Sequence, residues 1–246
     1  MKNWAFLSTH FDDVALSAGG LVWELTQRGD QVEIWTICAG DPPIDQPLTD
    51  YAQMLHVFWE LGKADVPYRR SLEDAACCQV LGAGFRRYTV PDCIYRFHPL
   101  TGQPMVNVPD DINLPLGSDE AYLVPPVTDF LRKNLYQGIE LVSPLAIGQH
   151  RDHVLTRLAA ERLGPPLWHY VDYPYVNREE VDLKDCIPES AERFSLSVSP
   201  DGLQAWQEGI LCHKSQMIML FADEAEMRQS IAAYAQSGGG SSLWRF

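Results

Sequence analysis

The chain has 246 residues, of which 46% are hydrophobic, and its formal net charge at pH 7 is -14. This length and apolar content are sufficient for a large core. The acidic balance argues against a nucleic-acid interface, which needs clustered Lys and Arg, and against anionic membrane surfaces. We therefore expect a protein that acts on a small molecule and has no nucleic-acid partner. Homo-oligomer formation is left open.

The compartment is predicted from the cysteines and the N-terminus. Six scattered cysteines without a C-x-x-C pair are typical of reduced thiols in a core. The segment MKNWAFLST reaches the polar His10 before a signal-peptide core could form, and no run of about 18 apolar residues occurs for a membrane span. We expect a cytoplasmic protein.

The first part of the chain is predicted to alternate strands and helices. Apolar runs with aromatic or β-branched residues predict strands at 4–9 and 31–38. Apolar residues at helical spacing predict helices at 15–29, 48–61 and 71–82. The two strands should be parallel, because a helix connects them. A Pro-rich loop occupies 41–47, and Ser71 with Asp74 forms a variant capping box.

The second part continues this pattern after an aperiodic segment, 91–117, which we expect to be a long loop or an insertion. Pro125 and Pro126 should bend the next helix or delay its start. The predicted elements are a helix at 118–135, a strand at 139–145, a helix at 151–164, strands at 167–175 and near 193–199, and helices near 201–221 and 223–235.

The alternation predicts an α/β fold with a Rossmann-like, mostly parallel sheet flanked by helices. We expect a single domain over 1–246. Its glycine-rich end, 236–246, is predicted to be a flexible tail.

Two polar segments follow two of the predicted strands: STHFDD (8–13) and GQHRDH (148–153). Ligands of open α/β sheets bind outside the carboxyl ends of the strands, so these segments can converge there. His10, Asp13 and His153 would then supply two imidazoles and a carboxylate, a set suited to catalytic zinc. A lone H-x-D-D is more often structural, but the second segment favours a metal site. The other histidines lack such partners and are interpreted as structural or surface residues, the alternative being that one of them contacts substrate: His56, His98, His169 and His213.

These residues resemble the zinc-dependent de-N-acetylases of the PIG-L (LmbE-like) type, whose signature is a strand followed by H-P-D-D-E and, later, H-x-D-H. The corresponding segments here are HFDDV and HRDH. RRSLEDAACCQVLG, PDCIYR, VDYPY and HKSQ extend the resemblance from residue 5 to about residue 220. It looks closest to the branch with H-L-D-D-A-V-L-S-C-G-G, which Ser17, Gly19 and Gly20 match. Phe11 is a mild departure, and Val14 replaces an acidic residue of the commoner form.

The resemblance implies a role for each matching residue. His10, Asp13 and His153 correspond to the ligands of zinc or another divalent metal. Asp12 corresponds to the general base and His150 to the group that stabilises the oxyanion. A protonated His150 in that role predicts that activity falls at alkaline pH.

Arg70 is a weaker correspondence. It is either a contact to substrate hydroxyls or an anionic group, or a cation on a helix surface.

We therefore expect a zinc-dependent N-deacetylase that removes the acetyl group from an N-acetylglucosamine-type amino sugar or sugar conjugate. The alternative is a catalytically degenerate sugar- or nucleotide-binding module of the same fold, against which the presence of all five chemical positions argues. A nucleotide-dependent transferase or dehydrogenase is disfavoured, because no G-x-G-x-x-G or P-loop follows the first strand. The segments 91–117 and 176–192, which would select the substrate, match nothing diagnostic.

Overall fold

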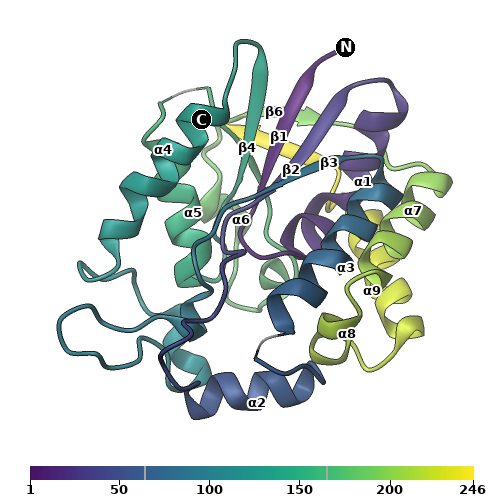
Figure 1. Cartoon of the computed structure of the whole chain (residues 1–246). Helices are drawn as coiled ribbons and strands as arrows, with labels where there is room; N and C mark the ends of the chain where they lie inside the picture. Colours follow the sequence, from purple (N-terminus) through teal and green to yellow (C-terminus); the bar gives the residue numbers. More distant parts are fainter. Residues whose placement is uncertain (64, 165) are drawn as a thin grey trace.

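The central strand β1 (Asn3–Ser8) is buried from Trp4 to Ser8 and pairs in parallel with a strand on each side. The computed structural model describes residues 1–63, 65–164 and 166–246. Strands in these ranges form a seven-stranded sheet in the order β3-β2-β1-β4-β5-β7-β6 (Figure 1). The remaining strands are β2 (Gln31–Thr36), β3 (Gly84–Arg87), β4 (Ile139–Pro144), β5 (Trp168–Tyr170), β6 (Glu192–Ser195) and β7 (Ser242–Arg245). Strands β1 to β5 pair in parallel, and β6 and β7 add an antiparallel edge.

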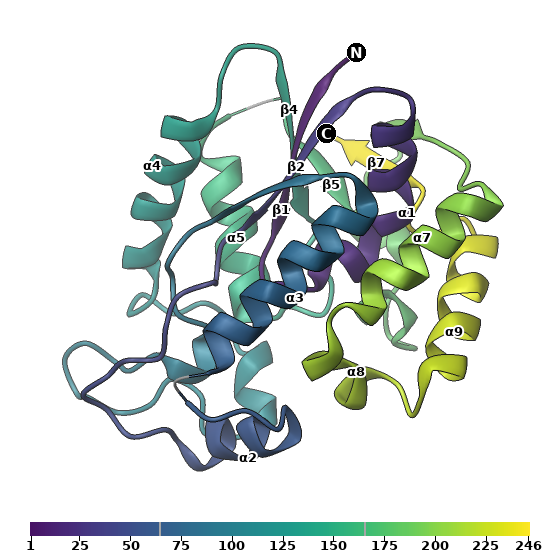
Figure 2. The same cartoon turned by 45° about the vertical axis from the view of Figure 1, so that its right-hand side comes forward.

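Helices cover both faces of the sheet (Figure 2). The α-helices of the described residues are α1 (Asp13–Gln27), α2 (Asp50–Phe58), α3 (Val66–Leu81), α4 (Val124–Asn134), α5 (Arg151–Glu161), α6 (Leu183–Cys186), α7 (Pro200–Leu211), α8 (Lys214–Leu220) and α9 (Glu224–Gln236). Helices α4 and α5 pack on one face, and α1, α3, α7 and α9 lie on the other. In the described ranges, no helix is both long and apolar enough to span a membrane.

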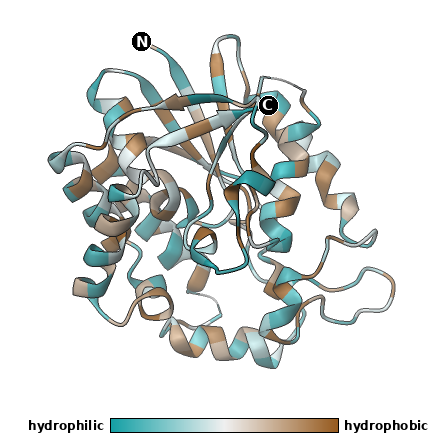
Figure 3. Cartoon of the chain, turned by 180° about the vertical axis from the view of Figure 1, so that it is seen from behind, coloured by the Kyte–Doolittle hydropathy of each residue, from teal (hydrophilic) through white to brown (hydrophobic). Residues whose placement is uncertain are grey.

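Side chains of β1 alternate between two cores, because successive residues of a strand point to opposite faces. Trp4 and Phe6 join the core under α1 and α7, whereas Ala5 and Leu7 join the core under α4 and α5. In Figure 3, hydrophobic residues, coloured brown, recur along the strands of the sheet. The α/β architecture with a mostly parallel sheet, predicted from the sequence, is confirmed.

Several element boundaries differ from the predictions. Helix α3 begins at Val66, because Pro67 favours a helix start, so Ser71 lies inside the helix rather than at a cap. The predicted helix at 201–221 is two helices, α7 and α8, separated at Cys212 and His213. Strand β3 was not predicted, since it is a short, largely exposed edge strand without an apolar pattern. Helix α4 starts late, with prolines in its first turn as expected.

All six cysteines are free, as predicted for reduced thiols. Those that are buried are Cys38, Cys77, Cys78 and Cys93, whereas Cys186 and Cys212 are partly exposed.

The prediction of a flexible tail at 236–246 is wrong for its second half. Residues Ser242–Arg245 form β7, which lies between β5 and β6, and Leu243 is fully buried. The glycines before β7 allow this reversal: Gly238 and Gly240 have φ values of 86° and 65°. The glycine-rich composition therefore marks a tight turn into the sheet.

We predict that Leu243→Ala lowers the free energy of unfolding by about 2–5 kcal/mol, the cost of a cavity in a packed core. The control Arg245→Ala, which removes a partly exposed ion pair with Glu192, should cost less than about 1 kcal/mol. Chemical denaturation measures both variants. A flexible tail would make the two changes equally neutral.

Candidate metal centre and active-site cleft

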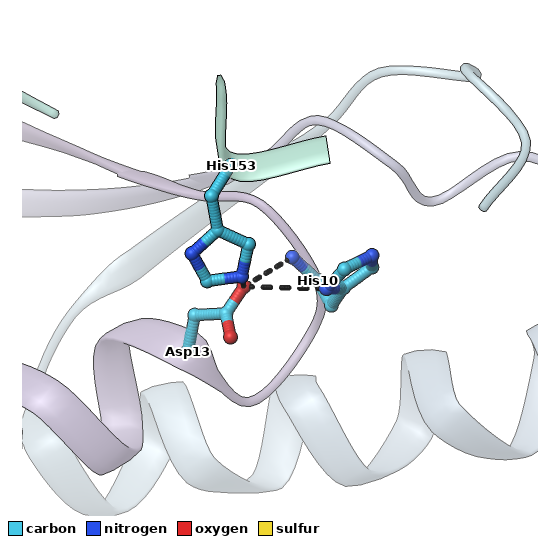
Figure 4. Close-up of side chains that lie close together, drawn as sticks. All are labelled: His10, Asp13 and His153. Atoms are coloured by element: carbon cyan, nitrogen blue, oxygen red, sulfur yellow. Dashed lines mark hydrogen bonds and ion pairs between the residues drawn. The ribbon is translucent and has the colours of Figure 1, made fainter. Parts of the chain in front are cut away.

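The two polar segments meet at one edge of the sheet. Strands β1 and β4 are parallel neighbours, so their carboxyl ends lie side by side. His10 follows β1, Asp13 opens α1, and His153 lies in the first turn of α5, which follows β4. Figure 4 shows these three side chains pointing toward one another, and all three are buried. Their convergence is the arrangement that the sequence predicts.

Hydrogen bonds in the turn between β1 and α1 orient the first two residues. The Asp13 carboxylate accepts a hydrogen bond of 2.7 Å from the backbone N–H of His10. The Ser8 hydroxyl donates to the His10 carbonyl at 2.6 Å and accepts from the Val14 N–H at 3.2 Å. Asp13 also lies at the N-terminus of α1, where the helix dipole favours a negative charge.

The donor atoms have the spacing of metal ligands. The Oδ2 atom of Asp13 is 3.5 Å from Nδ1 of His10 and 3.3 Å from Nε2 of His153. Two ligand atoms on a tetrahedral ion with bonds of about 2.0–2.2 Å are separated by about 3.3–3.6 Å. Moreover, the buried Nε2 of His153 makes no hydrogen bond within the described part of the chain. The three residues therefore fit a divalent cation.

A buried carboxylate orients each histidine from its other nitrogen. Nδ1 of His153 lies 2.7 Å from Asp172 Oδ1, and Nε2 of His10 lies 3.0 Å from Asp152 Oδ2. A proton shared with these carboxylates leaves the lone pairs of His153 Nε2 and His10 Nδ1 directed toward Asp13. Such carboxylate–histidine pairs are the usual support of metal-binding imidazoles.

The carboxylates around His10 and His153 favour the positively charged form of both imidazoles. Burial lowers the pKa of His153, but the charges of Asp13 and Asp172 outweigh it and raise that pKa to about 10. For His10, Asp92 is the largest influence opposing burial, and its pKa is also raised. A site that holds protons so firmly also attracts a cation, which competes with those protons.

Asp152 belongs to a buried ion network that reaches the 91–117 segment. Its carboxylate pairs with the Arg96 guanidinium and accepts a hydrogen bond of 2.9 Å from the Cys93 N–H. Arg96 also lies 2.8 Å from Glu120, which is 3.0 Å from Arg151. Burial would raise the pKa of Asp152, but the Arg96 charge outweighs it and keeps the pKa well below its usual range. Asp152 therefore remains a charged acceptor for His10.

Two other groups of possible ligands overlap with this network. One group consists of His10, His150 and Asp152, and the other of Asp92, Cys93 and Asp152. Both require Asp152, whose oxygens already accept from Arg96 and the Cys93 N–H. Burial raises the pKa of the Cys93 thiol well above its usual value, which disfavours the thiolate that metals bind. His10, Asp13 and His153 are therefore the best candidate ligands.

Asp12 and Arg70 face each other beside the candidate ligands. Nη2 of Arg70 lies 3.5 Å from Asp12 Oδ1, and Nη1 lies 3.9 Å from Asp92 Oδ2. Arg70 is 6% exposed and its guanidinium lies 5.1 Å from the centre of the Trp59 ring, so the interpretation as a helix-surface cation is wrong. Burial raises the pKa of Asp12, with Arg70 opposing and Asp13 reinforcing the shift.

His150 is the N-cap of α5, and its Nδ1 accepts a hydrogen bond of 3.2 Å from the Asp152 N–H. The neutral ring therefore carries its proton on Nε2. Burial first, then the charges of His10 and His153, lower the pKa of His150 well below 6.5. The expectation of a protonated His150, with its alkaline loss of activity, is therefore not supported. A neutral His150 still has one N–H to donate.

A cleft of about 280 Å³ opens beside these groups. Sequence reasoning missed several of its lining residues, namely Tyr51, Leu55, Trp59, Asp92, Tyr173, Tyr175 and Gln216. Four of these lie in PDCIYR, VDYPY and HKSQ, segments that carried the resemblance without an assigned role, whereas the α2 residues have no motif. His213, interpreted as structural or surface, is buried at the start of α8.

This fold and side-chain group define an α/β protein with a candidate metal centre at the carboxyl edge of its mostly parallel sheet. The family described as GlcNAc-PI de-N-acetylase (PIG-L) matches residues 5–163. The chain belongs to this family of de-N-acetylases, and the resemblance found in the sequence is confirmed.

Individual relatives extend this likeness over nearly the whole chain. The 2'-N-acetylparomamine deacetylase of Niallia circulans is 30% identical over 242 residues, which cover 92% of this chain and 85% of the relative. The zinc-inhibited form of teicoplanin deacetylase Orf2 is 26% identical, with a TM-score of 0.81 over 98% of this chain and 97% of that one. The A40926 pseudoaglycone deacetylase Dbv21 shares the fold, with 24% identity and a TM-score of 0.72 over 99% and 96% of the two chains.

We predict that Asp172→Asn weakens binding of a divalent metal by about 10–100-fold, because the orientation of His153 is lost. Asp30→Asn is the matched control: Asp30 is also buried, but it accepts from Lys2 and Trp4 at the opposite end of β1. Competition with a chromogenic chelator measures both affinities. Equal weakening in the two variants would contradict the role of Asp172.

Proposed function

We propose that the protein is a metal-dependent hydrolase that removes the acetyl group from an N-acetylated amino sugar within a larger conjugate. The observation that supports this proposal most strongly is the ligand-like spacing of His10, Asp13 and His153 beside Asp12, in a cleft that His150 also lines. Membership of a de-N-acetylase family is consistent with this chemistry.

His10, Asp13 and His153 would hold the cation, which is zinc or another divalent metal. When bound, such an ion supplies Lewis acidity, which polarises an amide carbonyl and makes water a stronger nucleophile at neutral pH. One relative is described as zinc-inhibited, so a test must compare zinc with other divalent metals.

Asp12 is the proton carrier of the proposed reaction. Its carboxylate accepts a proton from the attacking water and returns it to the leaving nitrogen, as a carbon–oxygen bond forms and the carbon–nitrogen bond breaks. Burial favours this role because it makes Asp12 a better proton acceptor than an exposed aspartate. Acetate and a free amine are the products.

Two further residues would bind the reacting amide and the sugar. His150 donates its Nε2–H to the oxygen on which negative charge develops, a role that requires no net charge on the ring. Arg70, which lies between Asp12 and Asp92, offers guanidinium N–H groups to substrate hydroxyls or to an anionic group.

The relatives are named for deacetylation of paromamine and teicoplanin compounds. We infer by analogy that this chain acts on an amino sugar of an aminoglycoside- or glycopeptide-type conjugate. The test is acetate release from a panel of N-acetylglucosamine conjugates, with protein loaded with zinc, cobalt, manganese or nickel. Tight sugar binding without acetate release under any metal would instead identify a degenerate binding module.

We predict that Asp12→Asn retains its metal but loses about 10²–10⁴-fold in kcat, because an amide cannot accept the proton. Asp13→Ala should lose the metal itself. Elemental analysis after gel filtration, together with acetate release, distinguishes these outcomes. Near-normal turnover of metal-loaded Asp12→Asn would rule out its role as the base.

The two histidines of HRDH should behave differently. His150→Ala is expected to keep its metal and to lose about 10²–10³-fold in kcat, the effect of one oxyanion donor, with a smaller change in KM. His153→Ala should lose metal affinity and recover part of its activity in excess metal. Equal metal loss in the two variants would show that these assignments are incorrect.

A further inference from the structure

The cleft has a polar end and an apolar end, joined by a chain of contacts. At the polar end, Asp92 lies 3.5 Å from His10 and 3.9 Å from Arg70. The Arg70 guanidinium lies 5.1 Å from the centre of the Trp59 ring, and the Trp59 indole N–H is 3.1 Å from the sulfur of Met219. These contacts connect His10, at the candidate metal centre, through Asp92, Arg70 and Trp59 to Met219.

The walls of the apolar end come from the α2 region, α8 and the 91–117 segment. The lining residues there are Tyr51, Leu55 and Trp59 of the α2 region, Ile94 and Ile112 of the 91–117 segment, and Met219 and Leu220 of α8. Among the described residues that line the cleft, the acidic and guanidinium side chains are Asp12, Asp13, Asp92 and Arg70. All four belong to the polar end, where Arg70 or a histidine faces each carboxylate.

The apolar surface continues outside the cleft. Helices α2 and α8 contact each other and lie beyond the carboxyl edge of the sheet (Figures 1 and 2). Their outward residues are strongly exposed: Val57 is 76%, Phe58 46%, Ile218 62% and Met219 44% exposed. Exposed apolar residues that gather in this way commonly mark a binding surface.

We propose that this apolar end binds an aromatic group that the substrate carries next to its N-acetylated sugar. This inference rests on the proposed function and specifies its substrate class. Trp59 and Tyr51 offer rings, and Met219 offers a polarisable sulfur, which together suit an aromatic partner. A cationic aminocyclitol would lose its hydration there without meeting a carboxylate, because those of the cleft lie at the polar end and already face Arg70 or His10.

The test compares three N-acetylglucosaminides that differ in the group attached to the sugar: methyl, phenyl and a protonated aminocyclitol. The metal-loaded enzyme should deacetylate the phenyl glycoside with a kcat/KM about tenfold or more above that of the methyl glycoside, chiefly through KM, because the ring buries apolar surface. The aminocyclitol glycoside should be no better than the methyl glycoside. An equal kcat/KM for methyl and phenyl, or a preference for the cationic compound, would overturn the proposal.

Two variants locate the preference. Met219→Ser should reduce the phenyl-to-methyl ratio of kcat/KM by about threefold or more, because it removes apolar contact at the proposed site. Leu72→Ser is the matched control: Leu72 is 48% exposed on α3 and lies outside the cleft lining, so the wild-type ratio should persist. Equal loss in the two variants would contradict the assignment.

Binding to the Asp12→Asn protein separates this proposal from the proposed function. Calorimetry should show tighter binding of the phenyl than of the methyl glycoside even without turnover. If none of the three compounds releases acetate but phenyl binding persists, the proposed function fails and the aromatic site stands. Sedimentation of the protein alone tests the alternative occupant of this surface, a second copy of the chain. A dimer that dissociates in Val57→Ser, together with no preference for the phenyl glycoside, would assign the surface to that second copy and overturn the proposal.

Discussion

The parallel pairing of β1 with β4 is the contact on which the candidate site depends. The two strands are far apart in the sequence, but their adjacent carboxyl ends bring His10 and Asp13 within ligand distance of His153. The hydrophobic cores on both faces of β1 hold this pairing, since Trp4, Phe6, Ala5 and Leu7 are all buried. The polar chemistry at the edge is therefore positioned by apolar packing behind it.

Concentrating carboxylates at that edge has a cost, because a buried charge loses its hydration. The structure offsets this cost by pairing each carboxylate. Asp172 pairs with His153, Asp152 with Arg96, and Asp12 with Arg70. Asp13 lies between two imidazoles, which outweigh burial and keep its pKa well below the usual range. The arrangement thus orients the histidines and preserves a negative local potential.

The sequence allowed prediction of the fold class, because hydrophobic periodicity and strand–helix alternation identify the elements. The convergence of the two polar segments was predicted from their position after two strands of an open α/β sheet, where ligands bind. Asp92 and Arg96 lie in an aperiodic segment, so their approach to Asp152 depends on tertiary packing that a local pattern does not encode. The same holds for β7. Its short pattern follows several glycines, and its partners, β5 and β6, lie far back in the chain. Burial, reinforced by the charges of His10 and His153, lowers the pKa of His150 and reverses its expected state, because these surroundings form only in the folded chain.

The 91–117 segment both lines the apolar end of the cleft and supports the candidate ligands at its polar end. Ile94 and Ile112 form part of its apolar wall, while Arg96 and the Cys93 N–H secure the carboxylate that orients His10. In the proposed function, substrate choice and cation binding are thereby coupled in one stretch of backbone. Exchanging this segment to broaden specificity would disturb the candidate metal centre as well, unless Arg96 keeps its place between Asp152 and Glu120. Diversification of this enzyme is consequently easier from α2 and α8, whose side chains reach the cleft without supporting a ligand.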